Sequence, residues 1–177
     1  MKTHLALLAA TGLMAACTQT APADMAGTSQ SDRVATANLR TATNASVGTA
    51  TATEVPGGVR IALTVNGVPQ GPHGVHVHTT GRCDAPDFTT AGGHWNPTSM
   101  QHGSKNPAGP HAGDMPNLLV GTDGTGSIEF TLPSGTFEGL LDADGSAFVV
   151  HAGADDLMTD PSGNSGGRFA CGVFNAA

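Results

Sequence analysis

The chain contains little charge, and most of that charge is negative. Only 12% of its 177 residues are charged, and 7 Lys and Arg stand against 14 Asp and Glu, which gives a formal net charge of -7. Proteins that bind nucleic acid usually present clustered Lys and Arg side chains, and the sequence has no such cluster. We therefore expect no nucleic-acid partner.

Long apolar runs are also missing. The apolar run Leu5 to Ala16 is too short to span a bilayer as a helix. It follows Lys2 and precedes Cys17, which is the pattern of a secretory signal, with a plain N-terminal arm as the alternative. Leu13-Met14-Ala15-Ala16-Cys17 also resembles a bacterial lipobox, although its Met replaces the more usual Leu. The pattern predicts a signal peptide over 1–17, export to the periplasm or cell envelope, and membrane attachment through a lipid at Cys17.

Cysteine is scarce, with three residues in the chain. An odd number is awkward in an exported protein, because one cysteine is left over from pairing. If Cys17 carries the lipid, Cys83 and Cys171 remain as a candidate disulfide, which suits an oxidising compartment. The alternative is two unpaired buried thiols.

Helix signals are nearly absent, whereas strand signals recur. Residues 18–32 are small and polar without periodicity, as in a flexible tether. From Arg33 onward, short Thr, Val and Ala runs of period two are separated by Gly, Pro and Asp. This pattern predicts one all-β domain over 33–177, an eight-stranded barrel or sandwich. The predicted strands are Val34–Arg40, Val47–Glu54, Val59–Val65, Val75–Thr79, Asn117–Gly121, Ser127–Thr131, Ala147–His151 and Phe169–Phe174.

Two long segments, Thr80–Pro116 and Ala152–Arg168, lack a strand pattern. Loops of that length inside a compact domain usually carry function, and both of these adjoin histidines. Trp95 and Phe88, in the first loop, are candidates for an interface between copies. The sequence leaves both a monomer and a homodimer open.

Histidine is concentrated in one part of the chain, since seven of the eight lie between residues 73 and 151. Side chains alternate along a strand, so His76 and His78 should project from one face while the intervening valines face the core. His151, at the end of another predicted strand, can add a third imidazole. His94, brought back by the first loop, can add a fourth, and together they indicate a four-nitrogen metal site.

A second cluster lies inside the first loop. His102, His111 and Asp114 would give a tetrahedral Zn²⁺ site that lacks one ligand. His94 can fill that position with its second ring nitrogen and so bridge two metal ions. We expect His73 to hydrogen-bond the backbone rather than to bind metal. A mononuclear zinc hydrolase is an alternative interpretation of these residues, because a zinc site that activates water also uses histidines.

At these residues the chain resembles the copper,zinc superoxide dismutase family, over approximately Arg33–Ala177. The motifs that carry the resemblance are Gly74-Val-His-Val-His78, Gly93-His-Trp-Asn-Pro97, His111-Ala-Gly-Asp114, Val150-His-Ala-Gly-Ala-Asp-Asp156 and Gly167-Arg-Phe-Ala-Cys-Gly172. The Gly-Gly-His-Trp motif, the spacing from Cys83 to His94 and the signal segment resemble the exported bacterial branch.

The resemblance implies a Greek-key flattened barrel with two long functional loops, and it implies an enzyme. That enzyme would convert two superoxide anions and two protons to dioxygen and hydrogen peroxide by Cu(II)/Cu(I) cycling, as antioxidant defence of the cell envelope. The implied copper ligands are His76, His78, His94 and His151, and the implied zinc ligands are His94, His102, His111 and Asp114. Asp155 would link ligands of the two metals, Arg168 would hold the superoxide anion, and His94 would supply a proton to the peroxide product.

One segment departs from many members of the family. Asp155–Gly167 contains no Lys or Arg, so the attraction of superoxide would rest on the metals, Arg168 and Lys105. The alternative function is an exported protein of the same fold that binds or delivers copper or zinc without turnover. The complete copper set and the presence of Arg168 favour the enzyme.

Overall fold

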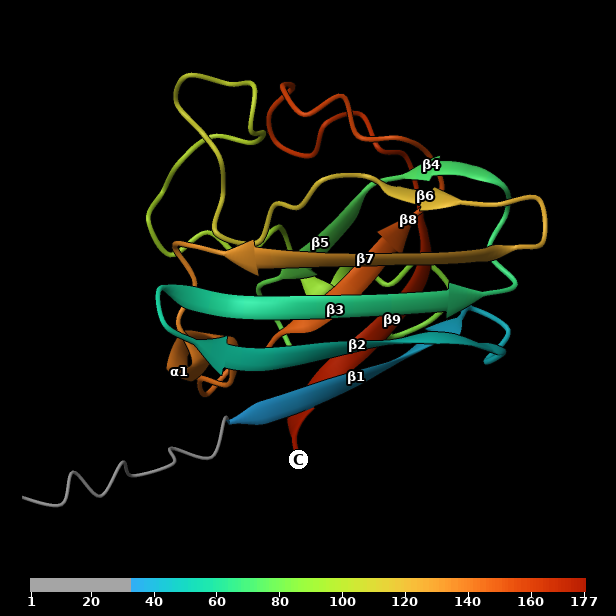
Figure 1. The fold of residues 1–177 in the computed structure, drawn as a ribbon, viewed down its shortest axis with the longest axis horizontal. Coiled ribbons are helices and arrows are strands. Elements are labelled where there is room, and N and C mark those ends of the chain that lie inside the picture. Colours follow the sequence, from blue (N-terminus) through green and yellow to red (C-terminus); the bar gives the residue numbers. More distant parts are fainter. Residues whose placement is uncertain (1–32) are drawn as a thin grey trace, which may run out of the picture. The chain divides into compact units, whose positions relative to one another are not determined.

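The computed structural model describes residues 33–177, which form a nearly all-β domain (Figure 1). The predicted signal peptide, the tether and the lipid site at Cys17 lie outside the described residues. The strands are β1 (Val34–Thr41), β2 (Ser46–Val55), β3 (Gly58–Asn66), β4 (Gly71–His73), β5 (Val75–His78), β6 (Leu118–Val120), β7 (Thr125–Leu132), β8 (Ala147–His151) and β9 (Arg168–Ala176). The helical segments of this part, η1 (Thr89–Ala91) and α1 (Phe137–Leu140), are too short to pass through a bilayer.

Among the described strands, the sheet order is β5-β8-β9-β1-β2-β3-β7, and β4 pairs with β6. β6 lies against β7, and β4 continues into β5 across Gly74, so the strands close into a barrel. The chain crosses the barrel after β3 and again after β7, which are Greek-key connections. The prediction of an all-β Greek-key barrel is therefore confirmed. Each of the eight predicted strands overlaps an observed strand, and β4 is the described strand that was not predicted.

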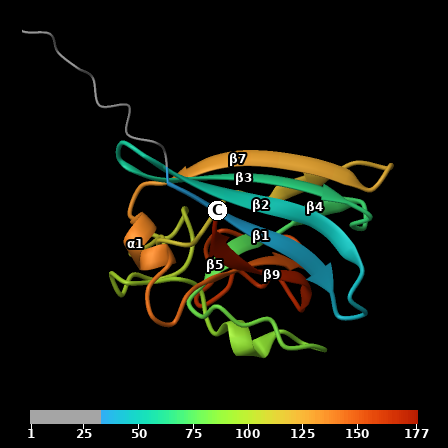
Figure 2. The same ribbon diagram turned by 90° about the horizontal axis from the view of Figure 1, so that it is seen from below.

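The barrel is flattened into two layers. Figure 2 shows β7, β3, β2 and β1 on one side and β5 and β9 on the other. Alternation along β1 sends Ala35, Ala37 and Leu39 inward, where all are fully buried. The largest of the other fully buried apolar side chains are Phe148, Ile61, Leu63, Leu118, Leu132 and Leu140.

A disulfide fastens the first long loop to the barrel. Cys83 and Cys171 are joined, with their Cα atoms 5.7 Å apart, which confirms the predicted disulfide and removes the alternative of two free thiols. Around it, Phe88 and Ala91 from the loop pack on the outward side chains of β8. β8 is consequently buried on both faces.

The prediction that Phe88 and Trp95 lie at an interface is wrong, because their side chains are only 3% and 5% exposed. Trp95 lies against α1 and the turn before it. A Cβ atom added at Gly135 would be 2.8 Å from Trp95 Cζ3, so the absence of a side chain there makes room for the indole. Both aromatic rings anchor the first loop to the barrel instead of facing solvent.

Phe148 offers a test of the core. Its side chain is fully buried and packs edge-on against Phe174, with 6.2 Å between ring centroids. We expect Phe148→Ala to lower the free energy of unfolding by about 3–5 kcal/mol, measured by denaturant titration. Leu119, which is 73% exposed, is the matched control, and Leu119→Ala should change it by less than about 0.5 kcal/mol. Equal losses in the two variants would contradict this account of the core.

Candidate metal centre

Three of the clustered histidines stand on paired strands. His76 and His78 belong to β5, which pairs antiparallel with β8, and His151 ends β8. Val75 and Val77 enter the barrel core, so the two histidines of β5 face the other way. The long loops cover that face, and the three imidazole-bearing residues are at most 3% exposed.

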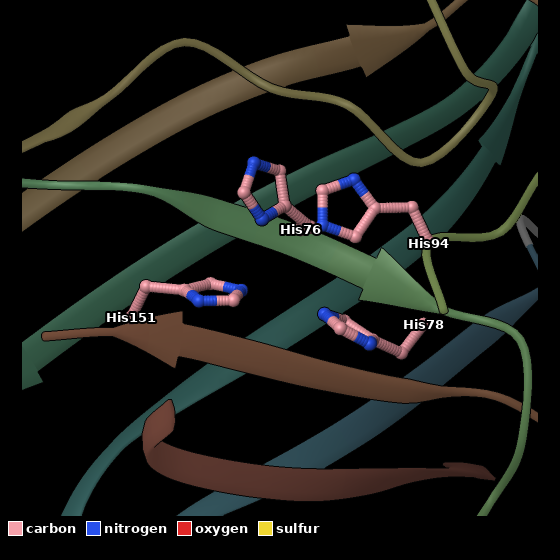
Figure 3. Close-up of side chains that lie close together, drawn as sticks. All are labelled: His76, His78, His94 and His151. Atoms are coloured by element: carbon pink, nitrogen blue, oxygen red, sulfur yellow. The ribbon is translucent and has the colours of Figure 1, made fainter. Parts of the chain in front are cut away.

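His94 comes from the first long loop where it runs beside β5. Its backbone forms a bridge with His78, and Trp95 donates its backbone N–H to Val77 O at 2.8 Å. The buried indole of Trp95 therefore holds the loop that positions His94. Figure 3 shows the rings of His76, His78, His94 and His151 gathered around one space.

Each of these four imidazoles has one buried nitrogen without a hydrogen-bond partner. The four atoms are His76 Nδ1, His78 Nε2, His94 Nε2 and His151 Nε2. One ring nitrogen of each residue lies within 4.8 Å of those of the others. Buried polar atoms are nearly always hydrogen-bonded, because an unpaired one forfeits about 1–3 kcal/mol. Four such atoms together form a set of ligands for a cation.

The opposite ring nitrogens have acceptors, which determine where the protons reside. His78 Nδ1 donates to Gly92 O at 2.9 Å, and His151 Nδ1 donates to Gly166 O at 3.2 Å. With its proton on the outer nitrogen, each ring turns a lone pair inward. His76 follows the same rule, because its outer Nε2 faces a carboxylate at 2.6 Å.

Burial keeps these imidazoles uncharged. Desolvation lowers the pKa of His76 to about 3, that of His78 to about 2 and that of His151 to about 4. Near neutral pH the cluster therefore presents neutral nitrogen donors, which is the form that binds metal.

The second predicted cluster also comes together, around one oxygen of Asp114. Asp114 Oδ1 lies 2.8 Å from His94 Nδ1, 3.1 Å from His102 Nδ1 and 3.2 Å from His111 Nδ1. Three imidazole nitrogens and a carboxylate oxygen thus converge. His94 uses a different ring nitrogen in each cluster, so its ring stands between them.

The backbone holds the Asp114 carboxylate in place. Asp114 Oδ2 accepts hydrogen bonds from Gly103 N at 2.9 Å and from His111 N at 3.0 Å. Burial opposes ionisation, but the hydrogen bonds from His102 and His94 outweigh it and hold the pKa of Asp114 well below its usual range. His76 lies beside this group too, since its ring packs 3.9 Å from that of His94.

Asp155 connects the two clusters through the ring nitrogens of His76 and His102 that point away from the proposed metal sites. Its Oδ2 lies 2.6 Å from His76 Nε2 and its Oδ1 lies 3.0 Å from His102 Nε2. Although burial opposes it, the hydrogen bonds to Asp114 and Asp155 raise the pKa of His102 to about 9. Gly163 closes over this pair, and a Cβ atom there would stand 1.8 Å from Asp155 Oδ1, so no other residue fits.

Arg168 stands at the first cluster. Its Nη1 donates to Phe88 O at 2.5 Å and its Nη2 to Gly92 O at 2.6 Å, so the guanidinium is held by the loop that the disulfide anchors. Burial lowers the pKa of Arg168, but a guanidinium stays charged in proteins. An open cavity of about 380 Å³ lies between this cation and the imidazoles, and residues that line it include His78, His94, His151, Ser162 and Arg168.

Backbone groups complete the site, and the sequence could not reveal them. Gly92 O accepts from both His78 and Arg168, and Gly166 O accepts from His151. Any residue supplies a carbonyl, so no residue type marks these positions. His73, as expected, bonds the backbone, with Nδ1 2.7 Å from His151 O.

Comparison with known proteins agrees with this geometry. The model of the copper/zinc superoxide dismutase family matches residues 46–174. A superoxide dismutase-like protein of Bacillus subtilis is 45% identical over 123 residues, which cover 66% of this chain and 63% of that relative, slightly under two thirds of its length. A copper-zinc superoxide dismutase of Caulobacter vibrioides is 40% identical over 147 residues, covering 79% of this chain and 84% of the relative.

A solved structure shares the fold. The crystal structure of the superoxide dismutase-like protein from Bacillus subtilis has a TM-score of 0.73 at 39% identity, and the match covers 78% of this chain and 96% of that one. With the family match extending over most of the chain, both imidazole clusters fall inside the shared region. The chain belongs to the copper/zinc superoxide dismutase family.

Proposed function

We propose that the protein is a superoxide dismutase, which converts two superoxide anions and two protons to dioxygen and hydrogen peroxide. The observation that carries the proposal is the set of four buried imidazole nitrogens without partners, beside a cavity that holds a fixed guanidinium. The names of the curated relatives support the same activity.

The donor sets fit copper and zinc. Neutral imidazoles suit copper, and three nitrogens with one carboxylate oxygen suit a closed zinc site. We assign copper to His76, His78, His94 and His151, and zinc to His94, His102, His111 and Asp114. The unpaired nitrogens of the first set and the convergence on Asp114 Oδ1 in the second support this assignment.

When bound, copper supplies one-electron redox chemistry, and zinc, which has none, supplies fixed charge. Arg168 holds the superoxide anion in the cavity, because its guanidinium is the cation that lines it. His94 Nε2 would take up a proton only when it is not bound to copper, and it would then donate that proton to the peroxide product. Asp155 orients His76 and His102 through hydrogen bonds to their outer nitrogens. A storage or delivery protein, the alternative, would have no use for the anion site at Arg168.

Export is consistent with the disulfide, since such bonds persist in oxidising compartments. Within the proposal, residues 1–17 are a signal peptide, 18–32 a tether and 33–177 the enzymatic domain in the periplasm or cell envelope. A lipid at Cys17 would attach the protein to the membrane.

Removal of His151 tests the copper assignment. His151→Ala deletes one of the four nitrogens that we assign to copper. Loss of a group that only orients a metal ligand costs about 10–100-fold, so loss of a ligand itself should lower copper content and superoxide turnover by at least about a hundredfold. Zinc content is the internal control and should stay unchanged, because His151 is not among the zinc ligands. Undiminished turnover would contradict the assignment.

Ionic strength tests how superoxide is attracted. Because Asp155–Gly167 has no Lys or Arg, turnover should fall by less than about threefold as the Debye length shrinks from roughly 30 Å in 0.01 M salt to roughly 8 Å in 0.15 M salt. Ser162→Lys, which adds a cation to the cavity wall, should make the fall steeper. A steep fall for the unmodified protein would show that other charges guide the anion.

Membrane attachment is tested at Cys17. We expect the full-length protein in bacterial cells to incorporate labelled fatty acid and to sediment with membranes, because lipidation adds a hydrophobic anchor. Cys17→Ala should take up no label and should not reach the membrane fraction. The same labelling and distribution for both forms would rule out a lipid on this residue.

A further inference from the structure

Asp160, in the second long loop, faces two of the proposed zinc ligands. Its Oδ1 accepts a hydrogen bond from His102 N at 2.7 Å. The same oxygen lies 3.7 Å from His111 Nε2, within ion-pair distance although beyond a direct hydrogen bond. One carboxylate oxygen thus reaches the backbone of one ligand and the ring of another.

The contact with His111 differs from those of the other histidine ligands, whose ring nitrogens facing away from the metal sites have a hydrogen-bond acceptor. His76 and His102 have the Asp155 carboxylate, His78 has Gly92 O, and His151 has Gly166 O. Within residues 33–177, His111 Nε2 makes no hydrogen bond, and Asp160 Oδ1 is the carboxylate oxygen facing it. Outer acceptors fix the orientation of metal-binding imidazoles and strengthen them as donors.

We propose that Asp160 is a positioning residue of the zinc site, which holds His102 through its backbone and orients the His111 imidazole by attraction to its Nε2–H. The proposal rests on the zinc assignment made above. It adds to Asp155 a second carboxylate that supports the site from the same loop.

Distance and exposure limit the size of the effect. The Asp160 side chain is 47% exposed, so solvent screens part of its attraction for His111. Loss of a group that orients a metal ligand weakens metal binding by about 10–100-fold, and we expect the lower end here, about tenfold.

Other contacts keep the two loops together when the carboxylate is altered. Lys105 N donates to Leu157 O at 2.9 Å, and Asn106 Nδ2 donates to Met158 O at 3.3 Å. Neither bond uses Asp160. A variant at this position should therefore fold, and its zinc affinity can be measured.

The test uses the full chain, stripped of metal and titrated with Zn²⁺ against a chromophoric chelator. Asp160→Asn keeps an oxygen that can accept from His102 N but removes the charge facing His111. Asp160→Ala removes both. Asp144→Asn removes an exposed carboxylate elsewhere in the described structure and is the matched control.

We expect the zinc dissociation constant to rise about tenfold in Asp160→Asn, at least as much in Asp160→Ala, and less than about twofold in Asp144→Asn. With Co²⁺ bound in place of zinc, the visible spectrum should change in Asp160→Asn and stay unchanged in Asp144→Asn. The unfolding midpoint of the metal-free protein should be the same in these two variants.

Zinc affinity within twofold of the unmodified protein in Asp160→Asn would overturn the proposal. So would a lowered metal-free midpoint with an unchanged Co²⁺ spectrum, because the carboxylate would then serve the fold and not the ligand. Failure of the zinc assignment itself looks different, since the unmodified chain would then bind no Zn²⁺.

Discussion

The structure depends on keeping several imidazole lone pairs away from water and pointed at one another. Each unpaired buried nitrogen forfeits about 1–3 kcal/mol, so the arrangement persists only because the surrounding barrel enforces it. The pairing of β5 with β8 fixes three of the rings, and the buried Trp95 fixes the loop that brings His94. The protein recovers that free energy when these nitrogens bind a metal ion.

The sequence predicts those parts of the structure that depend on periodicity and residue type. Alternation along β1 and β5 identifies the core side of each strand, and it places His76 and His78 together on the opposite side. The cysteine count makes Cys83 and Cys171 a candidate disulfide, and the structure contains it. β4 escaped prediction because Gly71, Pro72 and Gly74 interrupt its pattern, although it is part of the closed barrel.

What the sequence could not predict depends on three-dimensional neighbours. Trp95 and Phe88 look like interface residues in a polar loop, yet both are buried because α1 and β8 offer apolar surface to cover. Gly92 and Gly166 act through carbonyls that every residue possesses. The role that we propose for Asp160 depends on the contact between the two long loops, which brings its carboxylate close to His102 and His111.

The scatter of the proposed ligands along the chain has a consequence for when metal can bind. Apart from His76 and His78, they come from different strands and from a loop, and they meet only after the barrel has closed. An incompletely folded chain offers only weak local pairs, His76 with His78 and His111 with Asp114, so tight binding is reserved for the finished molecule. Because the metal ions bind tightly only to the native form, metal uptake shifts the folding equilibrium toward correctly folded molecules.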